Sequence, residues 1–258
     1  MRAPGLADPA ADRAGRWTLA ALAMVMVLQL SLVWTRAVNQ DEFYHYSQIH
    51  RLIAGTLAEP LQTLYTRAFA WVTQLPGNGI DHIQTIRLFM LGCELVTLGA
   101  ILGIASRFAS RRAAWLAVLA YAGAGYVLQH GGSFRFDSPA AALLMSAALI
   151  LLRSRLGPIA VLGTSVLAGA ALVLTIKAVL YAPVFAGIAW LRWTELGRGK
   201  VVTLRLAAVA LATLAAAAAI YALHASTLGH QANNAARALV GNAGGKMFEL
   251  GLPPYWRL

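Results

Sequence analysis

The sequence NQDEFYHY, residues 39–46, directly follows a long apolar run from Trp17 to Trp34. The apolar run is long enough to cross a bilayer as a helix. Two adjacent carboxylates, Asp41 and Glu42, are therefore expected just beyond a membrane span, followed by aromatic residues and a histidine. This is the most acidic of the few polar stretches, so it is the first place to look for chemistry.

The composition of the whole chain indicates a membrane protein. Of its 258 residues 59% are hydrophobic and only 12% are charged, whereas a soluble domain carries about 25% charged residues. Lipid offers no hydrogen-bond partner to a free backbone, so spanning segments must be helices or a closed barrel. Long runs of Ala, Leu and Val without alternation favour helices. We therefore predict an all-α polytopic membrane protein.

The chain is strongly basic, with a net charge of +11 and a pI of about 10.5. In a soluble protein this charge would suggest nucleic acid. Here the arginines cluster in short links between apolar runs, as membrane topology requires, so no nucleic-acid partner is expected. Membrane lipids with anionic headgroups, or a lipid phosphate, are the expected electrostatic partners. The single cysteine, Cys93, excludes an internal disulfide.

Three regions are expected along the chain. Residues 1–16 form a polar leader, expected to be disordered and cytoplasmic, residues 17–223 form the transmembrane module, and residues 224–258 form a polar tail. Within the module about seven spans are predicted by their apolar length. They are residues 17–34, 86–105, 113–128, 138–152, 158–176, 179–191 and 206–223.

The longest polar interval, residues 36–85, contains two amphipathic stretches. Phe43, Tyr46 and Ile49 recur at helical spacing in the first, which Gly55 could end. The second runs from Leu61 to Leu75. Both are too polar to span, so they are expected to be helices at the membrane surface.

The orientation follows from the basic links. Those at 107–112, 153–155 and 192–205 carry nine basic residues, whereas those at 129–137 and around 177 carry one each. The positive-inside rule places the first group in the cytoplasm. The predicted location is the plasma (inner) membrane, with a cytoplasmic N-terminus and with Asp41, Arg135 and Lys177 on the extracytoplasmic face.

Asp41 and Glu42 have two readings. A carboxylate just above the bilayer can act as a general base on a hydroxyl or ligate a divalent cation. Alternatively, the two acids favour the first turn of the surface helix that follows. A divalent metal ion is therefore a candidate cofactor. The outer histidines lack metal-binding spacing, which favours interfacial polar residues there.

Charged residues near the outer ends of the spans also allow two interpretations, one structural and one functional. Asp137 precedes Ser-Pro, as expected for a helix N-cap, while Arg135 could anchor at the headgroups or bind a phosphate. Lys177 and Arg87 could snorkel to the interface or meet a lipid phosphate. Glu94, inside a span, is expected to face the bundle interior and bond to a neighbouring helix.

Together these features resemble the C-type integral-membrane glycosyltransferases. In this family a first span is followed by an outer loop that opens with Asp-Glu-x-x-Tyr, and the sequence from Asp41 to Tyr46 is similar to that opening. The branch that it resembles most contains the protein O-mannosyltransferases and the lipid A aminoarabinose transferase. Further motifs over residues 17–193 resemble that family in order, spacing and sidedness. They are residues 49–55, Ile86-Arg87-Leu88, the basic hairpin 106–114, Arg135-Phe136-Asp137-Ser138-Pro139 and Thr175-Ile176-Lys177.

The resemblance implies an inverting transferase with a polyprenyl-phosphate-linked sugar donor and a lipid, glycan or protein acceptor. It implies that Asp41 is the base, with Glu42 beside it in the catalytic pair. The expected substrate-binding residues are Arg87, Arg135, Asp137, Lys177 and Tyr44. The family's Lys-Pro-Pro element is missing at Glu59-Pro60-Leu61, and members usually have more spans, so a second membrane chain is a possible partner.

Two other functions remain open at this stage. One is a non-catalytic membrane subunit that keeps the fold and binds a lipid or a partner chain. The other is a small transporter, although the spans contain few polar residues besides Glu94 to line a pathway.

Overall fold

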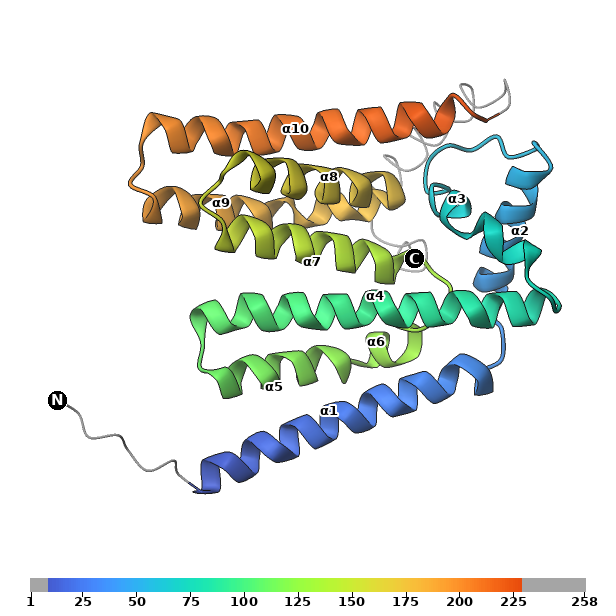
Figure 1. Ribbon diagram of the computed structural model, residues 1–258, viewed down its shortest axis with the longest axis horizontal. Coiled ribbons are helices and arrows are strands. Elements are labelled where there is room, and N and C mark those ends of the chain that lie inside the picture. Colours follow the sequence, from blue (N-terminus) through green and yellow to red (C-terminus); the bar gives the residue numbers. More distant parts are fainter. Residues whose placement is uncertain (1–8, 229–258) are drawn as a thin grey trace, which may run out of the picture.

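The computed structural model describes residues 9–228, and every regular element in that part of the chain is helical. The all-α prediction is confirmed there. Seven of the helices run side by side, and consecutive ones point in opposite directions (Figure 1). They are α1 (Pro9–Thr35), α4 (Gly79–Phe108), α5 (Arg111–Ala122), α7 (Asp137–Arg153), α8 (Pro158–Leu174), α9 (Ala182–Glu195) and α10 (Lys200–Ala225).

Three of these helices are long and apolar enough to cross a membrane, namely Gly15–Thr35, Gly79–Phe108 and Lys200–Ala225. The other four have 12 to 17 residues. A helix of 17 residues rises about 25 Å, whereas the hydrocarbon core is about 30 Å thick. Seven spans are therefore not confirmed by helix length alone.

Several predicted boundaries differ from those observed. The third span, expected over residues 113–128, is interrupted at Gly123, and a short helix α6 (Gly125–His130) follows. The sixth, expected over 179–191, begins as a 3₁₀ turn, η2 (Ile176–Tyr181), before α9. At the N-terminus α1 begins at Pro9, so residues 9–16 are helical rather than disordered.

Short helices cap one end of the bundle (Figure 1). The expected surface helix is α2 (Gln40–Ile53), which ends just before Gly55 in the left-handed conformation, φ +69°. The second stretch, expected from Leu61 to Leu75, forms only α3 (Tyr65–Phe69) and the 3₁₀ helix η1 (Ala70–Gln74). Of the expected tail, residues 224–228 are seen as the end of α10 and a turn, and 229–258 lie outside the described residues.

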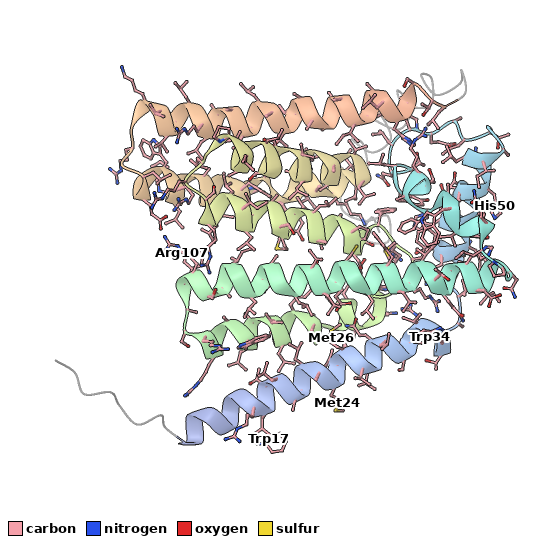
Figure 2. The ribbon with its side chains drawn as sticks, viewed as in Figure 1. Trp17, Met24, Met26, Trp34, His50 and Arg107 are labelled. Carbon is pink, nitrogen blue, oxygen red and sulfur yellow. The ribbon has the colours of Figure 1, made fainter. Side chains whose placement is uncertain are left out.

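The basic links meet at the opposite end of the bundle, where Arg107 lies (Figure 2). Arg107 forms an ion pair with Glu195 at 2.8 Å, and Arg153 donates to the Gly103 carbonyl at 2.6 Å. Arg107 and Arg153, from two of the basic links, thus lie at the end of the bundle opposite α2. We refer to the end with α2 as the acidic end and to the end with Arg107 as the basic end.

An aromatic cluster fastens α2 to the bundle. Tyr46 and Ile49 of α2, Tyr65 and Phe69 of the surface segment, and Phe134 before α7 are all buried together. The rings of Phe134 and Tyr65 meet edge to face, with centroids 5.7 Å apart. This packing holds the first turn of α2 beside the link that leads into α7.

Candidate functional site

Asp41, Arg135 and Asp137 meet at the acidic end. Asp41 is in the first turn of α2, and its Oδ2 lies 2.5 Å from Nη1 of Arg135. The Nε of Arg135 donates to Oδ2 of Asp137 at 3.1 Å. Burial would lower the pKa of Arg135, but Asp137, Tyr126 and Asp41 outweigh it and raise that pKa. One guanidinium thus joins two carboxylates that come from distant parts of the sequence.

The predicted N-cap role of Asp137 is wrong. Asp137 is the first residue of α7, and Phe136 holds the cap position without a side-chain hydrogen bond. The Asp137 carboxylate instead accepts from Arg135 and from the hydroxyl of Tyr126 at 3.2 Å. It therefore faces the cavity beside it rather than the helix backbone.

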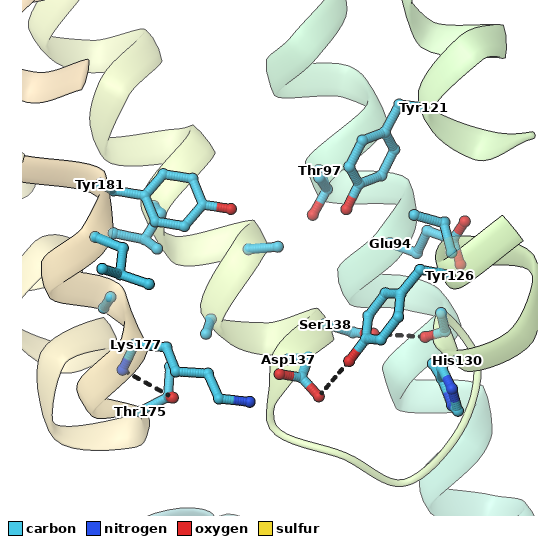
Figure 3. A pocket seen from close by; sticks show the side chains of 17 residues that line it. Glu94, Thr97, Tyr121, Tyr126, His130, Asp137, Ser138, Thr175, Lys177 and Tyr181 are labelled. Atoms are coloured by element: carbon cyan, nitrogen blue, oxygen red, sulfur yellow. Dashed lines mark hydrogen bonds between the residues drawn. The ribbon is translucent and has the colours of Figure 1, made fainter. Parts of the chain in front are cut away.

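A cavity of about 290 Å³ lies next to these residues, and we call it the first cavity. Asp137, Lys177, Tyr126 and His130 line it, and so does Glu94. In Figure 3 the side chain of Lys177 extends towards Asp137. The cavity therefore has a cation and a carboxylate facing each other, a combination that suits a ligand with both a phosphate and hydroxyl groups.

Local backbone structure explains the position of Lys177. Helix α8 ends at Leu174, and Thr175 has an extended backbone. The Thr175 hydroxyl then accepts from the backbone N–H of Lys177 at 3.3 Å and starts η2. This turn directs Lys177 back over the end of the bundle.

Glu42 and Arg87 are buried and use their polar atoms within the protein. The Nε and Nη2 of Arg87 donate to the two carboxylate oxygens of Glu42 at 2.8 and 2.7 Å. Glu42 also accepts from the backbone N–H of Phe134 at 2.8 Å and of Asn39 at 3.1 Å. Burial alone would raise the pKa of Glu42, but the hydrogen bonds from Arg87, Phe134 and Asn39 hold it below its usual value.

Arg87 also donates to the carbonyls of Val33, Arg36 and Ala37, at 2.9 to 3.2 Å, and so ties the end of α1 to α2 and α4. It is 1% exposed, so it neither snorkels to an interface nor faces a lipid phosphate. Neither Arg87 nor Glu42 lines the first cavity. Glu42, expected to be catalytic, and Arg87, expected to bind substrate, thus hold the helices around the site together instead.

Tyr44 lies on another side of the site. It is 60% exposed and lines a separate cavity of about 170 Å³, the second cavity, together with His45, Gln48 and Phe136. The Nδ1 of His45 lies 2.9 Å from the Tyr65 hydroxyl. Burial lowers the pKa of His45 more than nearby Asp41 raises it, so this imidazole is neutral at pH 7.

Three residues that line the first cavity, Tyr126, His130 and Glu94, were not predicted to be site residues. Tyr126 and His130 are four residues apart on α6, with ring centroids 4.8 Å apart, and that spacing could have indicated one shared helix face. Glu94 bonds to Gln29 of α1 at 2.8 Å, which confirms the expected bond to a neighbouring helix. Glu94 also lines the first cavity, which its position within an apolar run did not predict.

The residues at this site do not fit a metal ion. The Arg135 guanidinium already lies between the carboxylates of Asp41 and Asp137. Within residues 9–228 no group of three or more His, Cys, Asp or Glu side chains is placed to hold a metal.

Comparison of the chain with protein-family models, with curated proteins and with solved structures finds no match.

Proposed function

We propose that this protein is a membrane glycosyltransferase that moves a sugar from a polyprenyl-phosphate donor to an acceptor hydroxyl. The observation that carries the proposal is the contact between Asp41 and Arg135, beside a cavity lined by Asp137 and Lys177. Transfer from a lipid-linked donor needs a base, cations for the leaving phosphate and a cavity for the sugar, and this end of the apolar bundle offers all three. The ordered motifs that resemble C-type glycosyltransferases support the same reading.

In the proposed reaction Asp41 takes the proton from the acceptor hydroxyl. The acceptor oxygen forms a bond to the anomeric carbon as the bond from that carbon to the phosphate oxygen breaks, so the configuration inverts. The leaving lipid phosphate gains charge, which Arg135 and Lys177 stabilise as fixed cations. Arg135 lies at the edge of the first cavity, next to its lining residue Asp137. In the reaction Arg135 exchanges part of its contact with Asp41 for the phosphate, which frees the carboxylate to act as base.

The buried ion pair of Glu42 and Arg87 positions the catalytic residues in this proposal. Glu42 accepts from the backbone of Phe134, which immediately precedes Arg135, and its partner Arg87 holds the end of α1. Together they fix the first turn of α2, and hence Asp41, relative to the link that carries Arg135. Asp137 orients the sugar, and Tyr44 contacts substrate from the second cavity.

The proposed setting is the inner membrane, with seven spans and the acidic end on the extracytoplasmic face. Two of the four short helices have a helical neighbour in the chain, because α6 follows α5 after the break at Gly123 and η2 directly precedes α9. Large apolar side chains on the outside of the bundle, such as Leu95, Leu211 and Leu214, are more than half exposed and would contact lipid.

The experiment uses the full chain in liposomes with a panel of decaprenyl-phosphate-linked sugars, including mannose, glucose and arabinose. Release of decaprenyl phosphate is measured in the presence of membrane extract as the acceptor source. We expect Asp41→Asn to lower release by about 100-fold or more, the usual contribution of a general base. Lys177→Met should also lower it, whereas the basic-end variant Lys200→Met should not.

Unchanged release by a correctly folded Asp41→Asn variant would contradict the mechanism. If no donor is consumed and the chain co-purifies with a second membrane protein that restores activity, the alternative of a non-catalytic subunit is supported instead.

A further inference from the structure

The two cavities at the acidic end share a wall one residue thick. In the link before α7, Phe136 lines the second cavity and the next residue, Asp137, lines the first. The same alternation occurs after α8, where Ile176 lines the second cavity while Lys177 lines the first. Phe136 and Asp137 are at the start of α7, and Ile176 and Lys177 are in the first turn of η2. Successive residues of a helix point about 100° to 120° apart, so each of these two segments faces both spaces.

The proposed base, Asp41, lines neither cavity but is linked to this wall through Arg135. Asp41 contacts Arg135, the residue that immediately precedes Phe136 and Asp137. On α2, Asp41 is followed at helical spacing by Tyr44, His45 and Gln48, which all line the second cavity. A group in the second cavity would thus approach Asp41 from α2, and a group in the first would approach it from Asp137.

The linings of the two cavities differ in charge. The first has Lys177 and Asp137. No lysine or arginine is among the described residues that line the second, and its one carboxylate, Glu59, is paired with Arg51 at 3.4 Å. The other lining side chains are three aromatic rings, two amides, one threonine hydroxyl, the neutral imidazole of His45 and four aliphatic groups. The aliphatic groups are those of Leu61, Leu172, Val173 and Ile176. Rings with hydroxyl- and amide-bearing neighbours suit an uncharged ligand with both C–H faces and hydroxyl groups.

Polar groups in the second cavity have capacity to spare. Gln48 accepts from Arg51 at 3.2 Å through its carbonyl oxygen, and its side-chain nitrogen has no partner among residues 9–228. The Tyr44 hydroxyl likewise bonds to no other residue in that range, although Tyr44 packs against His45 with ring centroids 5.5 Å apart. At about 170 Å³ the space is smaller than a pocket for a drug-sized ligand, so it suits one ring-sized group.

We propose that the second cavity is the acceptor site and that it takes a neutral sugar ring at the end of the acceptor. This rests on the proposed transferase function. The donor's phosphate and sugar occupy the first cavity, the acceptor ring occupies the second, and its hydroxyl reaches Asp41 across the wall formed by Phe136–Asp137 and Ile176–Lys177. The acceptor is thus a glycan rather than a protein or a bare lipid.

Ligand binding to the full chain in phosphatidylcholine nanodiscs tests the assignment. Methyl glycosides of mannose, glucose and galactose are detected by saturation-transfer NMR, with a serine-containing tripeptide as the competing acceptor class. Decaprenyl phosphate binding is followed in parallel by the shift in unfolding temperature. We expect Tyr44→Ala and Gln48→Leu to weaken glycoside binding about tenfold, equivalent to about 1.4 kcal/mol, and to leave decaprenyl phosphate binding unchanged.

Phe43→Ala is the matched control, because Phe43 is also on α2, is 46% exposed and lines neither cavity. Lys177→Met should give the reverse pattern, with weaker decaprenyl phosphate binding and unchanged glycoside binding. If decaprenyl phosphate binds but glycosides do not, if the tripeptide binds in their place, or if Tyr44→Ala and Gln48→Leu have no effect, the acceptor assignment is overturned. If decaprenyl phosphate does not bind either, the proposed function fails with it.

Discussion

Glu42 and Arg87 form a two-pronged ion pair whose side chains are 0% and 1% exposed. Removing one partner of a buried pair leaves an unpaired charge, which costs about 3–5 kcal/mol. We therefore expect Arg87→Met to lower the free energy of unfolding by about that amount. Chemical denaturation in detergent, followed by tryptophan fluorescence, measures it.

The ion pair between Arg107 and Glu195 provides the control. Its side chains are 41% and 29% exposed, and exposed pairs contribute about 0–1 kcal/mol. Arg107→Met should therefore have little effect. Equal losses for Arg87→Met and Arg107→Met would contradict the anchoring role of the buried pair.

The acidic end should lose stability in acid. The pKa of Glu42 is held below its ordinary value of 4.5, so its contribution is complete above that pH and is lost as pH falls through the lower folded value. The pKa of His45 is lowered below 6.5, so the folded state disfavours the proton and stability already begins to fall below pH 6.5. Both groups act in the same direction.

Unfolding temperatures between pH 7.5 and pH 4 test this expectation. His45→Gln keeps a hydrogen-bonding group but cannot be protonated, so it should reduce the decline between pH 6.5 and pH 5 and leave the decline below pH 4.5 that Glu42 causes. A wild-type unfolding temperature that is flat between pH 6.5 and pH 5, or one that rises, would be inconsistent with the buried neutral imidazole.

The sequence predicted the ends of the bundle better than the details of the site. Alternating spans and asymmetric basic links were enough to place Asp41, Arg135 and Lys177 at one end, because each crossing reverses the chain direction. The break at Gly123 and the 3₁₀ turn at η2 escaped detection, since an apolar run can continue through an interruption that only tertiary packing determines.

The separate roles of Asp41 and Glu42 were also not predicted. The two residues are adjacent and chemically alike, but neighbours on a helix point about 100° apart, so one faces the core and the other the site. A local pattern could have distinguished them. Asn39 and Glu42 form a capping box in which each side chain bonds to the backbone of the other residue, which assigns Glu42 to the start of α2.

Helices α8 and α10 should be sensitive to size at Gly169. A Cβ there would lie 2.9 Å from the Thr213 carbonyl and the Ala217 nitrogen, both backbone atoms of α10. Such overpacking costs about 1–3 kcal/mol, so Gly169→Ala should destabilise the protein in the same denaturation experiment. Gly99→Ala is the control, because its Cβ would meet nothing within 4 Å and alanine favours the helix by about 1 kcal/mol. A stabilising Gly169→Ala would show that α8 and α10 are not in close contact.

Activity should depend on the guanidinium of Arg135 and not only on its positive charge. Its Nη1 and Nε contact Asp41 and Asp137 separately, whereas lysine offers one point charge without a fork. Losing one charge-assisted hydrogen bond costs about 1.5–3 kcal/mol, so Arg135→Lys should lower release of decaprenyl phosphate by about tenfold or more. Arg135 is only 23% exposed, so the unfolding temperature should fall as well, and release is therefore measured well below it. Arg36→Lys is the matched control, because Arg36 is also at the acidic end but bonds to the Gln129 carbonyl. Full activity of Arg135→Lys would mean that Asp41 and Asp137 do not need a common partner, and the bridging role of this residue would have to be abandoned.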